Sequence, residues 1–236
     1  MPTVLAHAKL TVSLRMTGLR DDGYHLIDAE MVSLDLHDTL EISPGTGLDV
    51  VGPAGTETIG ADEDNLVTRA LKLCGRDAHI RLEKRIPAGA GLGGGSSDAA
   101  AVLRWAGYDD PVGASSIGAD VAFCLRGGRA RVRGIGELLE PLPFEERTFT
   151  LVTPPVMCST PVVYAAWDRM GGPTGDNGND LEPAALDVAP GLARWRDELA
   201  DASGQRPRLA GSGSTWFVEG AFPGEGRVVA RTVPEQ

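Results

Sequence analysis

The chain has 236 residues, of which 42% are apolar, so it is long enough for one large domain or two modest lobes around a packed core. Its formal net charge of −11 argues against non-specific binding to nucleic acid or to an anionic membrane, because both require a basic surface. Three widely spaced cysteines, Cys74, Cys124 and Cys158, form no C-x-x-C pair and predict neither a disulfide framework nor a zinc site. In the absence of a signal-peptide pattern and of a membrane-spanning apolar run, we expect a cytoplasmic protein.

A half-buried strand is predicted near the start of the chain. Apolar and polar residues alternate strictly over residues 6–16, which is the period of a strand with one buried face. Lys9 and Thr11 fall side by side on the polar face. Lys9 is one of only three lysines, so it either serves a task that needs a compact ammonium or is an ordinary solvated lysine. The alternation alone leaves both interpretations open.

Tyr24 and His25 lie just after a turn and before a second alternating stretch, residues 32–42, so a meander of strands is expected. A flat ring beside an imidazole suits the stacking and hydrogen bonding of a ligand base. An aromatic residue that simply packs on the edge of a sheet is at least as common, and the pattern does not decide between the two.

The most informative stretch is a glycine-rich loop that leads into a predicted helix. Five of the seven residues 89–95 are glycine, and Pro87 precedes them. Ser96 or Ser97 is the expected N-cap of a helix that continues through residues 98–103. A glycine loop at a helix N-terminus directs free N–H groups and the positive end of the helix dipole at one point, which favours phosphate.

Three other interpretations of residues 89–95 are weaker. A flexible linker conflicts with the strand-like and helix-like runs on either side. Gly89, Gly91 and Gly94 satisfy the dinucleotide pattern G-x-G-x-x-G, but the alternating run at residues 79–86 predicts a sheet with one solvated face, whereas a doubly wound parallel sheet needs nearly continuous apolar strands. A Walker loop is excluded because no lysine follows a glycine in this chain.

The second half of the chain repeats the mixture of strands and helices. Asp120 lies between small residues and an apolar run, where it is either a partly buried candidate base or an N-cap. Residues 141–146 are typical of a linker between lobes. Thr160 is the expected N-cap of a helix with proline in its first turn. Residues 211–214 form a second small glycine loop, which suits either a hairpin turn or the approach of a phosphate.

Taken together, these residues resemble the GHMP superfamily of small-molecule kinases. The stretches that carry the resemblance are residues 8–11 (AKLT) with 22–25 (DGYH), 87–100 (PAGAGLGGGSSDAA) and 208–218 (RLAGSGSTWFV), supported by 118–121 (GADV) and 179–182 (NDLE). The resemblance implies an α+β, two-lobed fold: a ribosomal-S5-like nucleotide-binding lobe over residues 1–143, a ferredoxin-like lobe over residues 144–236, and an active site in the cleft between them.

The resemblance also implies the chemistry of the site. The cofactors would be ATP and Mg²⁺, with Ser97 as metal ligand and Asp98 as a neighbour of the metal. Asp120 would take the proton of the substrate hydroxyl, and Lys9 would lower the pKa of that hydroxyl and hold the carboxylate. Such parts suffice for phosphoryl transfer, which depends mainly on positioning and charge neutralisation. The residues expected around ATP are Pro87, Gly89, Ala90, Gly91, Leu92, Gly93, Gly94, Gly95, Ser96 and Ser97.

Tyr24-His25 is the feature that, by resemblance, indicates a cytidyl-diphospho polyol as substrate, phosphorylated on its 2-hydroxyl in the non-mevalonate route to isoprenoid precursors. The expected substrate-binding residues are Thr11, Tyr24, His25, Tyr164, Gly211 and Ser212. Members usually carry asparagine in place of Thr11, and the segment before Asp120 is shorter than usual. Another small alcohol or sugar as acceptor, and an inactive nucleotide-binding homologue, are therefore the alternatives.

Overall fold

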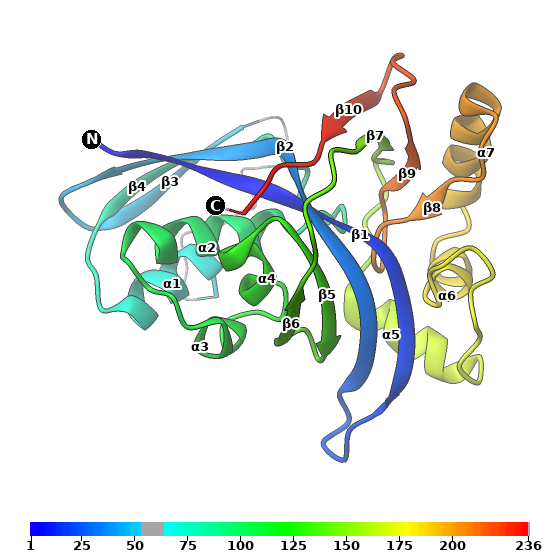
Figure 1. Cartoon of the computed structure of the whole chain (residues 1–236), viewed down its shortest axis with the longest axis horizontal. Coiled ribbons are helices and arrows are strands. Elements are labelled where there is room, and N and C mark those ends of the chain that lie inside the picture. The colour runs from blue at the N-terminus through cyan, green and yellow to red at the C-terminus, as the bar shows by residue number, and fades with distance from the viewer. Residues whose placement is uncertain (53–63, 236) are drawn as a thin grey trace.

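The longest elements are two antiparallel strands, β1 (Thr3–Leu19) and β2 (His25–Ser43), which pair along almost their whole length. In the computed structural model, which describes residues 1–52 and 64–235, they cross the molecule from end to end (Figure 1). The strand predicted over residues 6–16 is therefore present and extends further at both ends. Ala8, Leu10 and Val12 are buried, as the alternation predicted. Lys9 and Thr11 on the opposite face are buried too, at 5% and 2% exposed, so the prediction of a half-buried strand with a solvated polar face is wrong at these two positions.

Within the residues that the structure describes, the first sheet has six strands, and β2 is its centre. β4 (His79–Glu83) and β5 (Arg129–Gly134) pair with opposite ends of β2, and β3 (Gly47–Val51) and β6 (Leu138–Pro141) extend the sheet outward. Four helices lie against this sheet: α1 (Leu66–Cys74), α2 (Gly94–Trp105), α3 (Pro111–Ser115) and α4 (Val121–Arg126). The short segment before Asp120 thus contains the five-residue helix α3.

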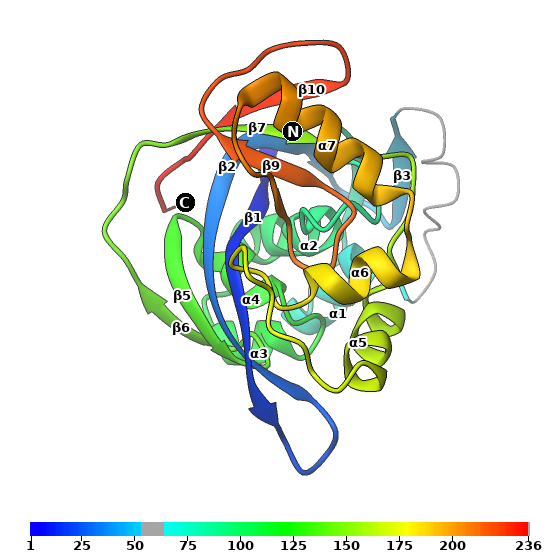
Figure 2. The ribbon, with the colours of Figure 1, turned by 90° about the vertical axis from the view of Figure 1, so that its right-hand side faces the viewer.

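The second sheet has four antiparallel strands in the order β10-β7-β9-β8. They are β7 (Thr148–Val152), β8 (Arg208–Leu209), β9 (Trp216–Glu219) and β10 (Arg227–Arg231). The remaining helices lie on this side of the molecule: α5 (Thr160–Arg169), α6 (Glu182–Val188) and α7 (Leu192–Ser203), as Figure 2 shows. The α+β class is confirmed.

The two halves are joined through β1 and β2. Leu10 and Val32 from the first sheet share one buried cluster with Phe149 and Phe217 from the second. The first sheet ends at Pro141 and the second begins at Thr148. We propose a lobe boundary between residues 143 and 144, inside this connection. Within residues 1–52 and 64–235, every helix is too short or too polar to cross a bilayer.

Two helix starts differ from the sequence prediction. α2 begins at Gly94 with Gly93 as its N-cap, so neither Ser96 nor Ser97 caps it. Glycine propensity argues against a helical Gly94-Gly95 pair, but this preference is weak and is overridden by the packing of the rest of α2, whose residues 97–103 are buried. The N-cap of α5 is Ser159, one residue before Thr160, and Pro161 occupies the first turn as expected.

Candidate active site

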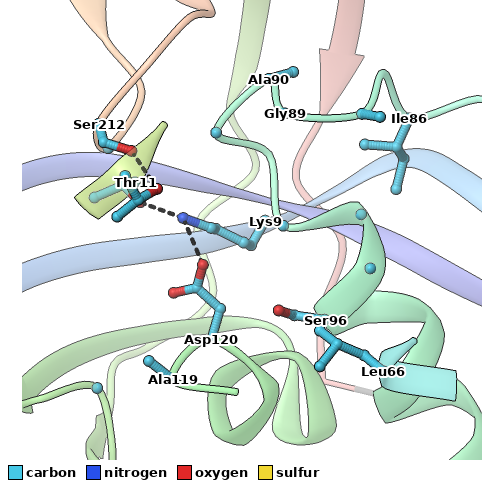
Figure 3. A pocket seen from close by; sticks show the side chains of 18 of the residues that line it. Lys9, Thr11, Leu66, Ile86, Gly89, Ala90, Ser96, Ala119, Asp120 and Ser212 are labelled. Carbon is cyan, nitrogen blue, oxygen red and sulfur yellow. Dashed lines mark hydrogen bonds and ion pairs between the residues drawn. The ribbon is translucent and has the colours of Figure 1, made fainter. Parts of the chain in front are cut away.

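A cavity of about 520 Å³ opens between the first sheet with its helices and, from the second half of the chain, α5 and the second glycine loop. β1, the glycine-rich loop and the starts of α1, α2 and α4 form most of its wall, and α5 with the second glycine loop closes the other side (Figure 3). Of the predicted site residues, the following line it: Lys9, Thr11, Pro87, Gly89, Ala90, Gly91, Gly93, Gly94, Gly95, Ser96, Asp120, Tyr164, Gly211 and Ser212.

Lys9 and Asp120 meet on this wall. The Lys9 ammonium lies 3.1 Å from an Asp120 carboxylate oxygen and donates a 3.0 Å hydrogen bond to the Thr11 hydroxyl. Lys9 is only 5% exposed, whereas one third of the Asp120 side chain is exposed. Asp120 occupies the N-cap position of α4 but makes no capping hydrogen bond. Its carboxylate is therefore held by the ammonium and still open to the cavity.

The backbone around Lys9 also fixes the glycine loop. The Lys9 N–H donates to the carbonyl of Leu92 at 3.0 Å. The pairing of β1 with β2 shifts register on both sides of residues 9–11, and such irregularities re-aim side chains next to functional sites. Gly93 has a φ of +66°, and a Cβ there would lie 2.6 Å from the Lys9 side chain. Glycine is thus required for the loop to pass this close to the strand.

The first turn of α2 faces the cavity with the backbone of Gly94, Gly95 and Ser96. The first N–H groups of a helix have no partner within the helix, and together with the dipole they favour an anion. Gly91 is equally constrained, because a Cβ there would lie 2.5 Å from the Ala210 carbonyl oxygen of the second glycine loop. The two loops therefore touch through their backbones.

The two serines of the loop differ in direction. The Ser97 hydroxyl donates to the carbonyl of His7 at 2.7 Å and lies 3.4 Å from the sulfur of Cys124, and the residue is 1% exposed. Ser96, in contrast, lines the cavity (Figure 3). Leu92 also points into the core. The geometry therefore favours Ser96 over the predicted Ser97 as the serine that reaches a bound metal or phosphate.

A second lysine, Lys84, sits deeper in the same wall between two buried carboxylates. Its ammonium donates to Asp38 and, at 2.7 Å, to Asp98, and all three residues are at most 5% exposed. Asp38 also accepts the backbone N–H groups of Arg85 and Ile86, where the glycine loop starts. Burial, helped by the charge of Asp38, raises the pKa of Asp98 to about 7 despite the nearby ammonium.

The expected substrate side is only partly assembled. Tyr164 lines the cavity, and burial followed by the Asp120 charge raises the pKa of its hydroxyl to about 12. The His25 ring lies 5.0 Å from the Tyr164 ring, and its Nε2 donates to Asp168 at 2.8 Å. Tyr24 is 59% exposed, packs beside Arg20 and does not line the cavity.

Four residues of this region were not predicted from the sequence. Asn65 caps α1 by accepting the N–H of Val67, and Asn65 and Leu66 both line the cavity. An asparagine before an apolar helical run is a recognisable N-cap signal. Lys84 could have been noticed as one of three lysines. Asp38 carries no local signal, because its partners lie 46 to 48 residues further along the chain.

Comparison with known proteins places these features in a family. The sequence matches the GHMP kinases N terminal domain over residues 65–128. A 4-diphosphocytidyl-2-C-methyl-D-erythritol kinase of Paracoccus denitrificans is 42% identical, with 90% of this chain and 84% of the relative covered. One from Cereibacter sphaeroides is 38% identical, with 100% of this chain and 95% of the relative covered.

Solved structures agree with these relatives. A crystal structure of 4-(cytidine 5'-diphospho)-2C-methyl-D-erythritol kinase matches with a TM-score of 0.76 at 32% identity, covering 98% of both chains. The Methanococcus jannaschii mevalonate kinase, at 11% identity and a TM-score of 0.56, shares the fold alone. Fold and site thus define a small-molecule kinase of the GHMP class. At this level of identity, the chain belongs to the family of the 4-diphosphocytidyl-2-C-methyl-D-erythritol kinases.

Proposed function

We propose that this chain transfers the γ-phosphoryl group of ATP to the 2-hydroxyl of 4-diphosphocytidyl-2-C-methyl-D-erythritol, a step of the non-mevalonate route to isoprenoid precursors. The observation that carries the proposal is the Lys9–Asp120 pair, which faces the same cavity as the N-terminus of α2. One wall thus offers a proton acceptor and an anion-binding backbone. The family relatives, which carry the name of this kinase, support the choice of substrate.

In this proposal Asp120 is the general base. The substrate hydroxyl passes its proton to the Asp120 carboxylate as its oxygen bonds to the γ-phosphorus, and the bond from that phosphorus to the bridging β–γ oxygen breaks, so that ADP leaves. Lys9, 3.1 Å from the carboxylate, lowers the pKa of the incoming hydroxyl and holds Asp120 in place. The burial of Lys9 strengthens this electrostatic effect, because less water screens the ammonium.

The glycine loop is proposed to bind the phosphates of ATP through the N–H groups of the first turn of α2. Mg²⁺ would neutralise charge on the phosphates. Among residues 1–52 and 64–235, no cluster of three His, Cys, Asp or Glu side chains is arranged to hold a metal. This fits an ion carried mainly by phosphate oxygens and water, as Mg²⁺ often is. Ser96, whose residue lines the cavity, is the proposed protein ligand.

The cytidyl side of the substrate is proposed to lie against Tyr164 and His25, which are already in ring contact. Tyr24 would complete the stack only after moving toward them, because it is largely exposed. Gly211 faces the Lys9–Thr11 pair, and Ser212, whose hydroxyl is hydrogen-bonded to that of Thr160, lines the same cavity; both would contact the diphospho-polyol.

The test is a turnover assay with the purified protein, ATP, Mg²⁺ and the cytidyl substrate. We expect ADP release that depends on the substrate, and a product whose new phosphate is assigned to the 2-position by ³¹P NMR. A reaction without acceptor is the control. If no substrate-dependent ADP appears, this function is wrong; a melting temperature that ATP still raises would then identify a nucleotide-binding homologue without catalysis.

A different acceptor is the second candidate, and Thr11 is the observation that favours it. The Thr11 hydroxyl is engaged by the Lys9 ammonium at 3.0 Å, and threonine cannot offer the paired donor and acceptor of an amide. A panel of small polyols and sugar alcohols, assayed under the same conditions, decides the question. Turnover of the cytidyl compound alone removes this candidate, whereas preferential turnover of another alcohol establishes it.

A further inference from the structure

Asn179, which the proposed mechanism does not use, lies buried behind the second glycine loop. It is 2% exposed, and its amide nitrogen donates to the carbonyls of Leu209 at 2.8 Å and Gly211 at 2.7 Å. Its amide oxygen accepts the N–H of Leu181 at 2.9 Å. Both N–H donors and the oxygen of the Asn179 amide are therefore engaged. The opposite orientation of the amide would place its oxygen against the carbonyl oxygens of Leu209 and Gly211.

The loop that Asn179 holds stands directly against the reacting groups. A Cβ on Gly211 would lie 3.7 Å from both the Lys9 ammonium and the Thr11 hydroxyl oxygen. On its other side the loop supports the ATP-binding loop, because the Thr215 N–H donates to the Ala90 carbonyl at 3.2 Å. A displacement of Gly211 would therefore disturb both the Lys9–Thr11 pair and the glycine-rich loop of residues 89–95.

The segment around Asn179 is itself fixed to β1. The Leu14 N–H donates to the Gly178 carbonyl at 2.8 Å, and the Asp180 N–H donates to the Leu14 carbonyl at 3.0 Å. The Asp180 carboxylate also accepts from Arg15 at 2.5 Å and from the Met16 N–H at 2.9 Å. Asn179 thus connects the strand that carries Lys9 with the loop that faces Lys9.

We propose that Asn179 is a positioning residue of the kinase: its two N–H donors set the distance between Gly211 and the Lys9–Thr11 pair, and so the geometry of the acceptor. This inference rests on the proposed function, since the acceptor is the molecule positioned there. Misplacement of reacting groups by about 1 Å lowers turnover by roughly a hundredfold in well-characterised enzymes. The effect should therefore appear in kcat.

Two variants and one control test the proposal. Asn179→Asp keeps the acceptor for Leu181 but loses both donors to the loop, and Asn179→Ala loses all three hydrogen bonds. Asn177→Ala is the matched control, because Asn177 lies in the same segment and donates to the carbonyl of Pro207, outside the cavity. kcat and both KM values are measured per folded molecule, below the melting temperature of each variant.

We expect both Asn179 variants to lose about tenfold to a hundredfold in kcat. Asn177→Ala should stay within about twofold of the parent in kcat, because Asn177 does not line the cavity and holds Pro207 rather than Gly211. If the Asn179 variants keep their kcat and lose only melting temperature, the residue is merely structural and the inference is wrong. An equal loss of kcat in Asn177→Ala would also overturn it.

Hydrogen exchange separates this inference from the proposed function. The amides of Gly213 and Thr215 are protected by bonds to Ala210 and Ala90. We expect them to exchange about tenfold faster or more in the Asn179 variants, and unchanged in Asn177→Ala. If the parent protein shows no turnover of the cytidyl substrate, the proposed function fails, and this readout still decides whether Asn179 fixes the loop. Unchanged exchange would refute the inference whatever the activity.

Discussion

Two buried lysines contribute to the same cavity wall, yet their surroundings differ. Lys84 lies between two carboxylates, Asp38 and Asp98, and all three side chains are withdrawn from solvent. Lys9 faces a single carboxylate, Asp120, whose side chain remains one third exposed. In the Lys84 cluster the charged groups interact only with protein groups, whereas the Asp120 carboxylate of the Lys9–Asp120 pair remains accessible from the cavity.

The two lysines thus hold opposite ends of one loop, and in the proposed mechanism only Lys9 also takes part in the chemistry. Asp38 accepts two backbone N–H groups at the start of the glycine loop, so the Lys84 cluster fixes where the loop begins. Lys9 fixes where the loop passes the strand, through its own N–H and the Leu92 carbonyl. Substitutions at each cluster should therefore separate loss of stability from loss of turnover.

The largest expected effect is on stability, from Lys84→Met. The substitution leaves Asp38 and Asp98 buried without a cation, and breaking a buried ion pair in this way costs about 3–5 kcal/mol. Urea denaturation measures the free energy of unfolding. Lys72→Met is the control, because Lys72 is exposed on α1 and should change that free energy by less than about 0.5 kcal/mol. Equal stability of the two variants would show that the cluster contributes nothing.

The next effect is on turnover, from Asp120→Asn. Removing the proposed base should lower kcat by roughly a hundredfold or more. Stability should fall less than in Lys84→Met, because one third of the Asp120 side chain is exposed and the amide that replaces the carboxylate still offers an oxygen to the Lys9 ammonium. Asp109→Asn removes an exposed carboxylate of the same lobe and should leave kcat unaltered. A loss below about tenfold for Asp120→Asn would mean that this carboxylate only orients the substrate.

The pH dependence of stability tests the deeper cluster. The pKa of Asp98 is raised to about 7 by burial and by Asp38, whereas an unfolded aspartate titrates at about pH 4. Between these values the folded state binds more protons, so the contribution of Asp98 to the free energy of unfolding falls as pH rises. The amide introduced by Asp98→Asn cannot ionise. The free energy of unfolding of Asp98→Asn minus that of the parent should therefore increase from about pH 5 to about pH 8. A difference that does not change with pH would contradict the raised pKa.

The smallest effects distinguish the two serines. Ser97→Ala loses the hydrogen bond to the His7 carbonyl and should lower the free energy of unfolding by about 1 kcal/mol without changing the Mg²⁺ requirement. Ser96→Ala should do the reverse: little change in stability, and a higher Mg²⁺ concentration for half-maximal ADP release. A shifted Mg²⁺ requirement in Ser97→Ala would restore the original prediction that Ser97 is the metal ligand.

The sequence was informative where a pattern is local. Alternation over residues 6–16 predicted the strand of Lys9, and the run of glycines predicted the loop that faces it. The direction of Ser97 was not predictable, because it depends on where α2 begins: a start at Gly94 turns Ser97 toward β1. The Lys84 cluster and the bonds of Asn179 join residues distant in the chain, and only the folded topology brings them together.

The Lys9 contacts have a consequence for inhibition. One residue anchors the glycine loop with its backbone and the Asp120 carboxylate with its side chain, and Gly93 passes it with no room for a single added carbon. A small molecule bound at this junction would contact both the proposed nucleotide side and the proposed acceptor side of the cavity. If Lys9 has its proposed role, substitutions at Lys9 or Gly93 that weaken the binding of such an inhibitor would also impair turnover.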